Sequence, residues 1–182
     1  MLEVSVSKKA ILKYNFADNV PAIKADATQM RQIIMNLITN ASEAIGNRSG
    51  VISISTGAME CDAAYLGETY LDEKLQTGVY SYYEVADTGC GMTEETKEKL
   101  FDPFYTTKFT GRGLGLSAVL GIVRGHHGVI KVHSEENKGT SIKVLFPIAE
   151  ESVIASEAST VAEVDKLDAR GTILLVDDEE SI

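Results

Sequence analysis

Two glycine clusters constrain this chain more than any other feature of its sequence. The first follows a carboxylate and reads Asp87-Thr88-Gly89-Cys90-Gly91-Met92, and the second reads Gly111-Arg112-Gly113-Leu114-Gly115-Leu116. Without a Cβ atom, glycine lets the backbone approach a ligand closely, so that its N–H groups can point at phosphate oxygens. The second cluster runs straight into an apolar helical pattern, and a helix adds its partly positive amino end to such a site. Together the two clusters predict a nucleotide site.

The composition narrows the class of protein. The 182 residues are 44% hydrophobic and 24% charged, which is ordinary for a soluble globular protein. The net charge of −10 argues against a nucleic-acid partner, because such proteins usually present a basic face. No apolar run reaches membrane-spanning length, and residues 1–10 lack a signal-peptide core. With Cys61 and Cys90 as reduced thiols, we expect a cytoplasmic chain without membrane contact, either soluble by itself or the soluble part of an anchored protein.

The hydrophobic pattern predicts strands and helices in alternating groups. Asp26 is expected to cap a long helix, with Gln29 completing a capping box, and Thr93 and Thr96 offer cap oxygens for a short helix. Residues 1–7 suit either a strand or the end of a helix, and residues 60–78 form an excursion between two strands. Strands are predicted at residues 11–16, 21–25, 51–56, 79–86, 129–133 and 140–146, and helices at residues 26–45, 93–101 and 116–124.

Two asparagines stand out in the long helix. Asn36 and Asn40 are four residues apart and therefore lie on one face. Asparagine is a mediocre helix former, because its side chain competes for backbone hydrogen bonds. A pair of satisfied, partly buried amides is the plainer explanation, but the glycine clusters favour a ligand.

The three histidines and the end of the chain point elsewhere. His126 and His127 are adjacent in a turn and His133 lies in a strand, without acidic or cysteine partners at ligand spacing. We therefore expect surface histidines that are not metal ligands. Residues 149–170 read as a solvated acidic linker. Residues 171–182 contain a buried-type strand and an acidic cluster, which we interpret as the truncated start of another domain.

Four motifs in the right order resemble the ATP-binding catalytic domain of sensor histidine kinases, in the GHKL superfamily. The resemblance covers residue 10 to about residue 147. It rests on QIIMNLITNASEAI at residues 32–45, DTGCGM at residues 87–92, FDPFYTTK at residues 101–108 and GRGLGLS at residues 111–117. ILLVDDEES at residues 173–181 resembles the first strand of a receiver domain. The resemblance implies a catalytic domain over residues 1–148, a linker over residues 149–170 and a receiver fragment over residues 171–182.

The resemblance also implies a fold, a reaction and a set of site residues. The expected fold is a Bergerat-type two-layer α/β sandwich, a mixed sheet covered by helices on one face, with a mobile ATP lid. Asp87 would select adenine, helped by Gly89, Gly91, Met92 and Thr140. Asn36 and Asn40 would be catalytic, with Asn40 holding Mg²⁺. Phe101, Phe104 and Tyr105 would anchor the base of the lid. Glycines of the lid would hold the phosphates, and Lys108 would neutralise their charge. The ATP-binding residues in this region would be Lys108, Gly111, Gly113, Leu114, Gly115 and Leu116.

Differences from the family pattern bear on the reaction. ATP-hydrolysing relatives carry a glutamate where this chain has Asn36, and an amide cannot act as a general base, so transfer to a protein is favoured over hydrolysis. Some kinase branches place a basic residue where Glu43 stands. The expected partners are an upstream dimerisation domain carrying the phosphoacceptor histidine and a downstream receiver domain. A self-contained GHKL ATPase and a nucleotide sensor without catalysis remain as alternatives.

Overall fold

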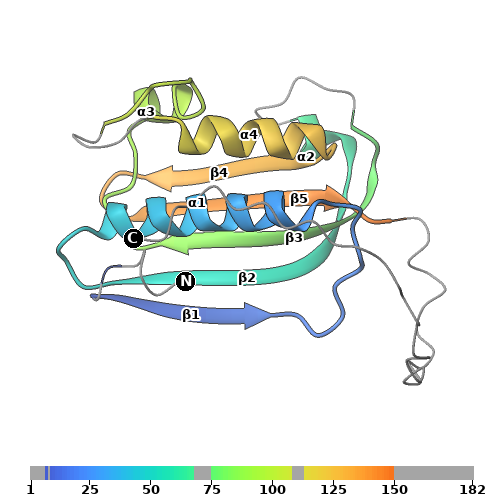
Figure 1. Ribbon diagram of the computed structural model, residues 1–182, viewed down its shortest axis with the longest axis horizontal. Helices are drawn as coiled ribbons and strands as arrows, with labels where there is room; N and C mark the ends of the chain where they lie inside the picture. Colours follow the sequence, from blue (N-terminus) through green and yellow to red (C-terminus); the bar gives the residue numbers. More distant parts are fainter. Residues whose placement is uncertain (1–6, 8, 68–74, 108–112, 150–182) are drawn as a thin grey trace, which may run out of the picture. The chain divides into compact units, whose positions relative to one another are not determined.

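The computed structural model describes residues 7, 9–67, 75–107 and 113–149. They form a mixed five-stranded sheet in the order β1-β2-β3-β5-β4 (Figure 1). The expected strand at residues 1–7, the linker and the receiver fragment lie outside these residues, apart from Ser7 and Ala149. The strands are β1 (Ala10–Phe16), β2 (Gly50–Cys61), β3 (Gly78–Asp87), β4 (Val129–Glu135) and β5 (Gly139–Pro147), and the helices are α1 (Ala27–Ile45), α2 (Ala63–Gly67), α3 (Glu94–Glu98) and α4 (Gly115–Gly125).

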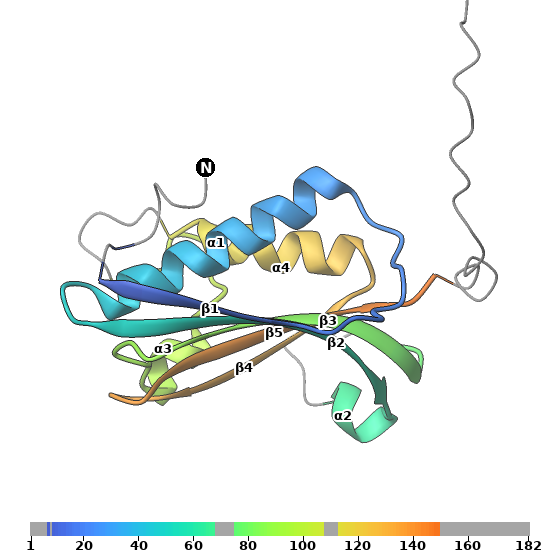
Figure 2. The ribbon, with the colours of Figure 1, turned by 90° about the horizontal axis from the view of Figure 1, so that it is seen from below.

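The sheet topology follows from its connections. β1 and β2 are parallel and are joined by α1, because parallel neighbours need a crossover connection. The pairs β2–β3, β3–β5 and β4–β5 are antiparallel. The two longer helices, α1 and α4, lie side by side on one face of the sheet (Figure 2). The predicted two-layer α/β fold is therefore confirmed.

The main core lies between this helical layer and the sheet. Both apolar stripes of α1 contribute to it, since Ile33 and Leu37 from one and Ile38 and Ala41 from the other are all buried. α4 adds Val119 and Val123, and the sheet adds alternate residues such as Val85, Ile142 and Val144. Strand residues an even number of positions away from these point towards the helices, and those an odd number of positions away point to the other face.

Helices do not lie on one face alone. The five-residue helix α2 lies against the other face near the end of β2 (Figure 2). Its Leu66 packs with Cys61, Tyr80, Val129 and Leu145 in a second, smaller cluster. The predicted excursion over residues 60–78 is correspondingly shorter than expected, because β2 continues to Cys61 before α2 begins.

Two predicted elements are wrong in extent. Residues 21–25 make only a single bridge, between Ile23 and Ile148, and the carbonyl of Pro21 accepts from a side chain, Ser81 Oγ, at 2.7 Å. The short helix begins as predicted, with Thr93 Oγ1 accepting from the N–H of Thr96 at 3.3 Å, but ends at Glu98 instead of residue 101. The described helices include none that is long and apolar enough to cross a membrane.

Candidate functional site

Asp87 and Thr140 lie opposite each other where β3 ends and β5 begins. They are register partners, and both have the parity that points towards the helices. Asp87 is half-buried, and its Oδ1 accepts the backbone N–H of Gly89 at 2.7 Å. That bond orients the carboxylate at the border between the sheet and the helical layer. It also means that the N–H of Gly89 is already directed at Asp87.

A buried serine supports Thr140 and was missed by the sequence analysis. Ser134 Oγ donates to the carbonyl of Gly139 at 3.1 Å and lies 2.9 Å from Thr140 Oγ1. Because Ser134 has one hydroxyl proton, Thr140 is the donor in the second bond, and the lone pairs of Thr140 remain available as acceptors. The period of two in β4 gives Ser134 the inward parity of Ile130, which is the signal that could have identified it.

The first glycine loop is fixed by backbone hydrogen bonds from three directions. The N–H of Thr88 donates to the carbonyl of Val51 at 3.1 Å, and the N–H of Cys90 donates to that of Ala44 at 3.0 Å. From the hairpin between β4 and β5, the N–H of Asn137 donates to the carbonyl of Cys90 at 2.7 Å. The loop therefore ties the end of α1, the start of β2 and this hairpin together.

Two glycines are required for this convergence. Gly91 has φ 64°, and a Cβ there would lie 1.9 Å from the carbonyl oxygen of Glu135. Gly139 has φ 116°, and its Cβ would lie 2.0 Å from the carbonyl oxygen of Asp87. Neither the conformation nor the contact is open to another residue. Met92 follows Gly91 and is half-buried.

The second glycine cluster meets the asparagines of α1. Asn36 and Asn40 are both half-buried. A Cβ on Gly115, the first residue of α4, would lie 3.4 Å from Asn36 Oδ1. Leu114 before it is exposed and makes no side-chain cap, whereas Leu116 packs against the core. The described part of the cluster is thus next to the Asn36 amide.

The residues that precede the second cluster depart from expectation. Phe101 is partly buried against the core, as an anchor should be. Phe104 is 75% exposed with φ 68°, so the expectation that it anchors the lid base is wrong. Its N–H instead donates to the carbonyl of Gly113 at 2.9 Å, while Leu100 before Phe101 is buried. Lys108 and Gly111 lie outside the described residues.

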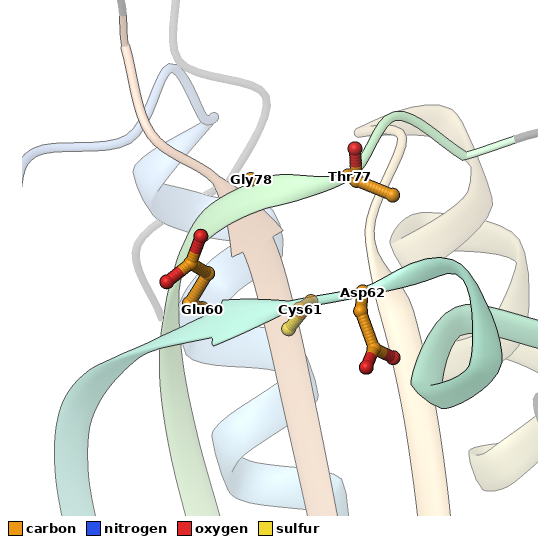
Figure 3. Close-up of a pocket in the computed structure, with 5 residues that line it drawn as sticks. All are labelled: Glu60, Cys61, Asp62, Thr77 and Gly78. Atoms are coloured by element: carbon orange, nitrogen blue, oxygen red, sulfur yellow. The ribbon is translucent and has the colours of Figure 1, made fainter.

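Two hollows can be compared with this arrangement. The larger, of about 580 Å³, lies between the end of β2 and the start of β3, lined by Glu60, Cys61, Asp62, Thr77 and Gly78 (Figure 3). Cys61 pairs with Gly78 at the end of the β2–β3 ladder opposite to Asp87, and the two acidic side chains there are poorly suited to phosphate. The smaller hollow, of about 180 Å³, has Asp87, Gly139 and Thr140 in its lining. Its other lining residues include Ala86, His133 and Ser141, which have the parity of the face away from the helices, so it reaches the predicted site only at its edge.

The histidines were only partly predicted. His133 is 3.7 Å from Glu135 and exposed, as expected. His126 is half-buried and both of its ring nitrogens have backbone partners, so it is not a surface histidine. Among the described residues there is no group of three or more histidine, cysteine or acidic side chains that could hold a metal.

Comparisons with known proteins agree with the fold and the motifs. Residues 25–150 match the family described as histidine kinase-, DNA gyrase B-, and HSP90-like ATPase. The chain is 35% identical to the sensor kinase CckA of Brucella abortus, over 97% of this chain and 19% of that protein. It is 32% identical to the sensor histidine kinase ZraS of Escherichia coli K12, over 78% of this chain and 26% of that protein. The chain thus spans about a fifth to a quarter of these relatives.

Solved structures give the same result. The catalytic domain of histidine kinase ThkA superposes with a TM-score of 0.56 at 30% identity, covering 77% of this chain and 80% of that one. Full-length ShkA, solved in complex with AMPPNP, shares the fold, with a TM-score of 0.61 at 23% identity over 81% of this chain and 28% of that one. The chain therefore belongs to the histidine kinase-, DNA gyrase B- and HSP90-like ATPase family, as an ATP-binding GHKL domain of the sensor histidine kinase kind.

Proposed function

We propose that this domain binds Mg-ATP between α1, the loop after β3 and the start of α4, and presents the γ-phosphate to a histidine on a separate phosphoacceptor domain. The observation that carries the proposal is the pair of Asp87 and Thr140, fixed side by side next to the glycine loop. The upstream dimerisation domain and the downstream receiver domain are part of the same proposal.

The adenine end of the site is assigned to Asp87. A carboxylate can accept the adenine amino group in a charge-assisted hydrogen bond. The bond from Gly89 to Oδ1 holds the carboxylate in one orientation before the nucleotide arrives. Thr140, whose hydroxyl proton is directed at Ser134, offers further acceptor capacity beside it.

The phosphate end is assigned to Asn40, Asn36 and the start of α4. Amide oxygens are hard ligands that suit Mg²⁺, with phosphate oxygens completing the shell. In the described residues, α4 begins without a side-chain cap, because its N-cap residue Leu114 offers no acceptor to the N–H groups of the first turn. That turn lies close to the Asn36 amide, since a Cβ on Gly115 would be 3.4 Å from Asn36 Oδ1. These residues fit a bound magnesium triphosphate, which would supply the transferable phosphoryl group.

The choice of transfer over hydrolysis rests on Asn36. Its amide cannot take a proton from water, so the domain can bind and orient the nucleotide but lacks a general base at this position. Phosphoryl transfer depends mostly on positioning and charge stabilisation, which leaves the acceptor to another domain.

Titration calorimetry with Mg-ATP tests the binding site. Replacing Asp87 with Ala should weaken affinity by roughly tenfold to a hundredfold, since a charged acceptor is lost from a half-buried position. Asp87→Asn removes the charge but keeps a side-chain oxygen that can accept the N–H of Gly89. It therefore separates weaker binding caused by the lost charge from weaker binding caused by a disordered loop. Asp18→Ala, at an exposed carboxylate after β1, is the matched control and should bind as the wild type does. Equal affinity of the wild type and Asp87→Ala would place the nucleotide elsewhere.

A second experiment tests the reaction. The chain is incubated with radiolabelled ATP, alone and with the separately produced phosphoacceptor domain of a relative such as CckA. We expect acid-labile label on the added domain, lost in Asn40→Ala. Brisk phosphate release without an acceptor would indicate an ATPase, and binding without any transfer would indicate a nucleotide sensor.

A further inference from the structure

His126 connects the carboxyl end of α4 to the amino end of α1. Its Nε2 lies 3.2 Å from the backbone nitrogen of Asp26, and its Nδ1 lies 2.9 Å from the carbonyl oxygen of Ile122, one turn earlier in α4. The ring is half-buried and stands edge-on to Phe146, with the ring centroids 6.1 Å apart. The first bond joins residues that are 100 positions apart in the chain.

These contacts define the state of the imidazole. The N–H of Asp26 must donate to Nε2, and the carbonyl of Ile122 must accept from Nδ1–H. The ring is therefore the neutral tautomer with its proton on Nδ1. One half of the predicted capping box is present, because Asp26 Oδ1 accepts the N–H of Gln29 at 2.8 Å. In the other half the Gln29 side chain would accept the N–H of Asp26, and here His126 Nε2 accepts it instead.

The two helices are thereby close together at both ends of the stretch over which they run side by side. One attachment is the hydrogen bond between His126 and Asp26, and at the other end α4 begins so near to α1 that a Cβ on Gly115 would lie 3.4 Å from Asn36 Oδ1. From Asp26 to Asn36 is ten residues and from Gly115 to His126 is eleven, which correspond to about 15 and 16.5 Å of helix. The matching lengths mean that a shift of α4 along α1 at one attachment must appear at the other.

We propose that His126 is a positioning residue, whose neutral imidazole sets the register of α4 against α1 and so places Gly115 beside the Asn36 amide. The inference rests on the proposed function in that Asn36 and the start of α4 belong to the ATP site. His126 itself is remote from that site and acts through the two helices.

Three variants of the full chain test the proposal. His126→Gln places an amide oxygen near the position of Nε2 and keeps an acceptor for Asp26. His126→Phe keeps the ring against Phe146 and removes the acceptor. His127→Asn changes the neighbouring imidazole, tolerates its φ of 53°, and is the control. The measurements are the affinity for Mg-ATP, the unfolding midpoint, and nuclear Overhauser contacts between the α-protons of Gly115 and the side-chain amide of Asn36 without nucleotide.

We expect His126→Phe to lose the Gly115–Asn36 contacts and to weaken Mg-ATP binding by roughly threefold to tenfold, the factor for one lost hydrogen bond. His126→Gln should keep both. Unchanged contacts and affinity in His126→Phe, with only a lower unfolding midpoint, would reduce His126 to a stabilising contact. A wild type that does not bind Mg-ATP would overturn the proposed function, while the Overhauser contacts would still decide the register.

Discussion

Gly139→Ala is a substitution for which the structure predicts a large local effect. Gly139 has φ 116°, and an added Cβ would lie 2.0 Å from the carbonyl oxygen of Asp87 and 3.0 Å from the Cα of Thr88. Both neighbours are backbone atoms, so neither can rotate away as a flexible side chain could. The hairpin must move, and with it the pairing of Asp87 with Thr140.

Two costs add to give the magnitude. A left-handed conformation costs an L-residue about 1–2 kcal/mol, and forcing extra volume into a packed site costs about 1–3 kcal/mol. The free energy of unfolding should therefore fall by about 2–5 kcal/mol, from a total of about 5–15 kcal/mol for a typical domain. Affinity for Mg-ATP should fall as well, because the displaced backbone carries Asp87.

Urea unfolding followed by far-ultraviolet circular dichroism measures the stability, since the chain has no tryptophan to report on unfolding. Gly121→Ala is the matched control. Gly121 is exposed in α4 with nothing within 4 Å of its Cβ position, so alanine there should raise the free energy of unfolding by about 0.5–1 kcal/mol. A free energy for Gly139→Ala within about 0.5 kcal/mol of the wild type would refute the packing argument for this glycine.

Four further outcomes are expected. The Tyr83 hydroxyl is buried without a hydrogen-bond partner among the described residues, so Tyr83→Phe should raise the free energy of unfolding by about 1 kcal/mol. Burial also raises the pKa of Tyr83, so above about pH 10 the unfolded chain loses a proton that the folded chain keeps, and the stability of the wild type falls as the pH rises. Urea unfolding at increasing alkaline pH should show a less steep fall for Tyr83→Phe, which lacks this proton. His127→Gly should raise the free energy of unfolding by about 0.5–1 kcal/mol, and the urea midpoint with it, because φ 53° favours glycine. Iodoacetamide should label the exposed Cys90 quickly without nucleotide and more slowly with Mg-ATP present. Cys61, whose pKa is raised by burial, should react slowly in both cases. Labelling of Cys90 at the same rate with and without Mg-ATP would contradict the proposed site.

Local patterns were sufficient for most of the fold. The alternation in β2, β3 and β5 and the two apolar stripes of α1 are set by burial against one partner layer, which sequence periodicity records directly. Asp26 and Thr93 cap their helices as predicted, because a cap depends on residues within one turn. Of the predicted site residues, the structure brings Asp87, Gly89 and Thr140 together and separately places Gly115 near Asn36; that all of them form one site remains a prediction.

The predictions that failed depend on contacts between distant segments. The strand expected at residues 21–25 has the right composition, but only Ile23 finds a partner. The partner of the Asp26 N–H comes from His126 and not from the neighbouring Gln29. Phe104 is exposed because its backbone is held by Gly113, a pairing that no hydrophobic pattern records. The buried bond between Ser134 and Thr140 likewise needs the hairpin register before it can be seen.

The backbone convergence at the hairpin between β4 and β5 has a consequence for engineering the protein. Exposed turns usually accept inserted tags or domains, and residues 136–138 are exposed. Here, however, the turn contacts Cys90 through Asn137, and Gly139 lies against Asp87, so the length of the turn is tied to the position of Asp87 in the proposed nucleotide site. An added residue would displace Asp87 although it is inserted at the surface. A reporter domain belongs instead at Gly67, the last residue of α2, where no described atom lies within 4 Å of the Cβ position; α2 follows the end of β2 that is opposite to Asp87 in the β2–β3 ladder.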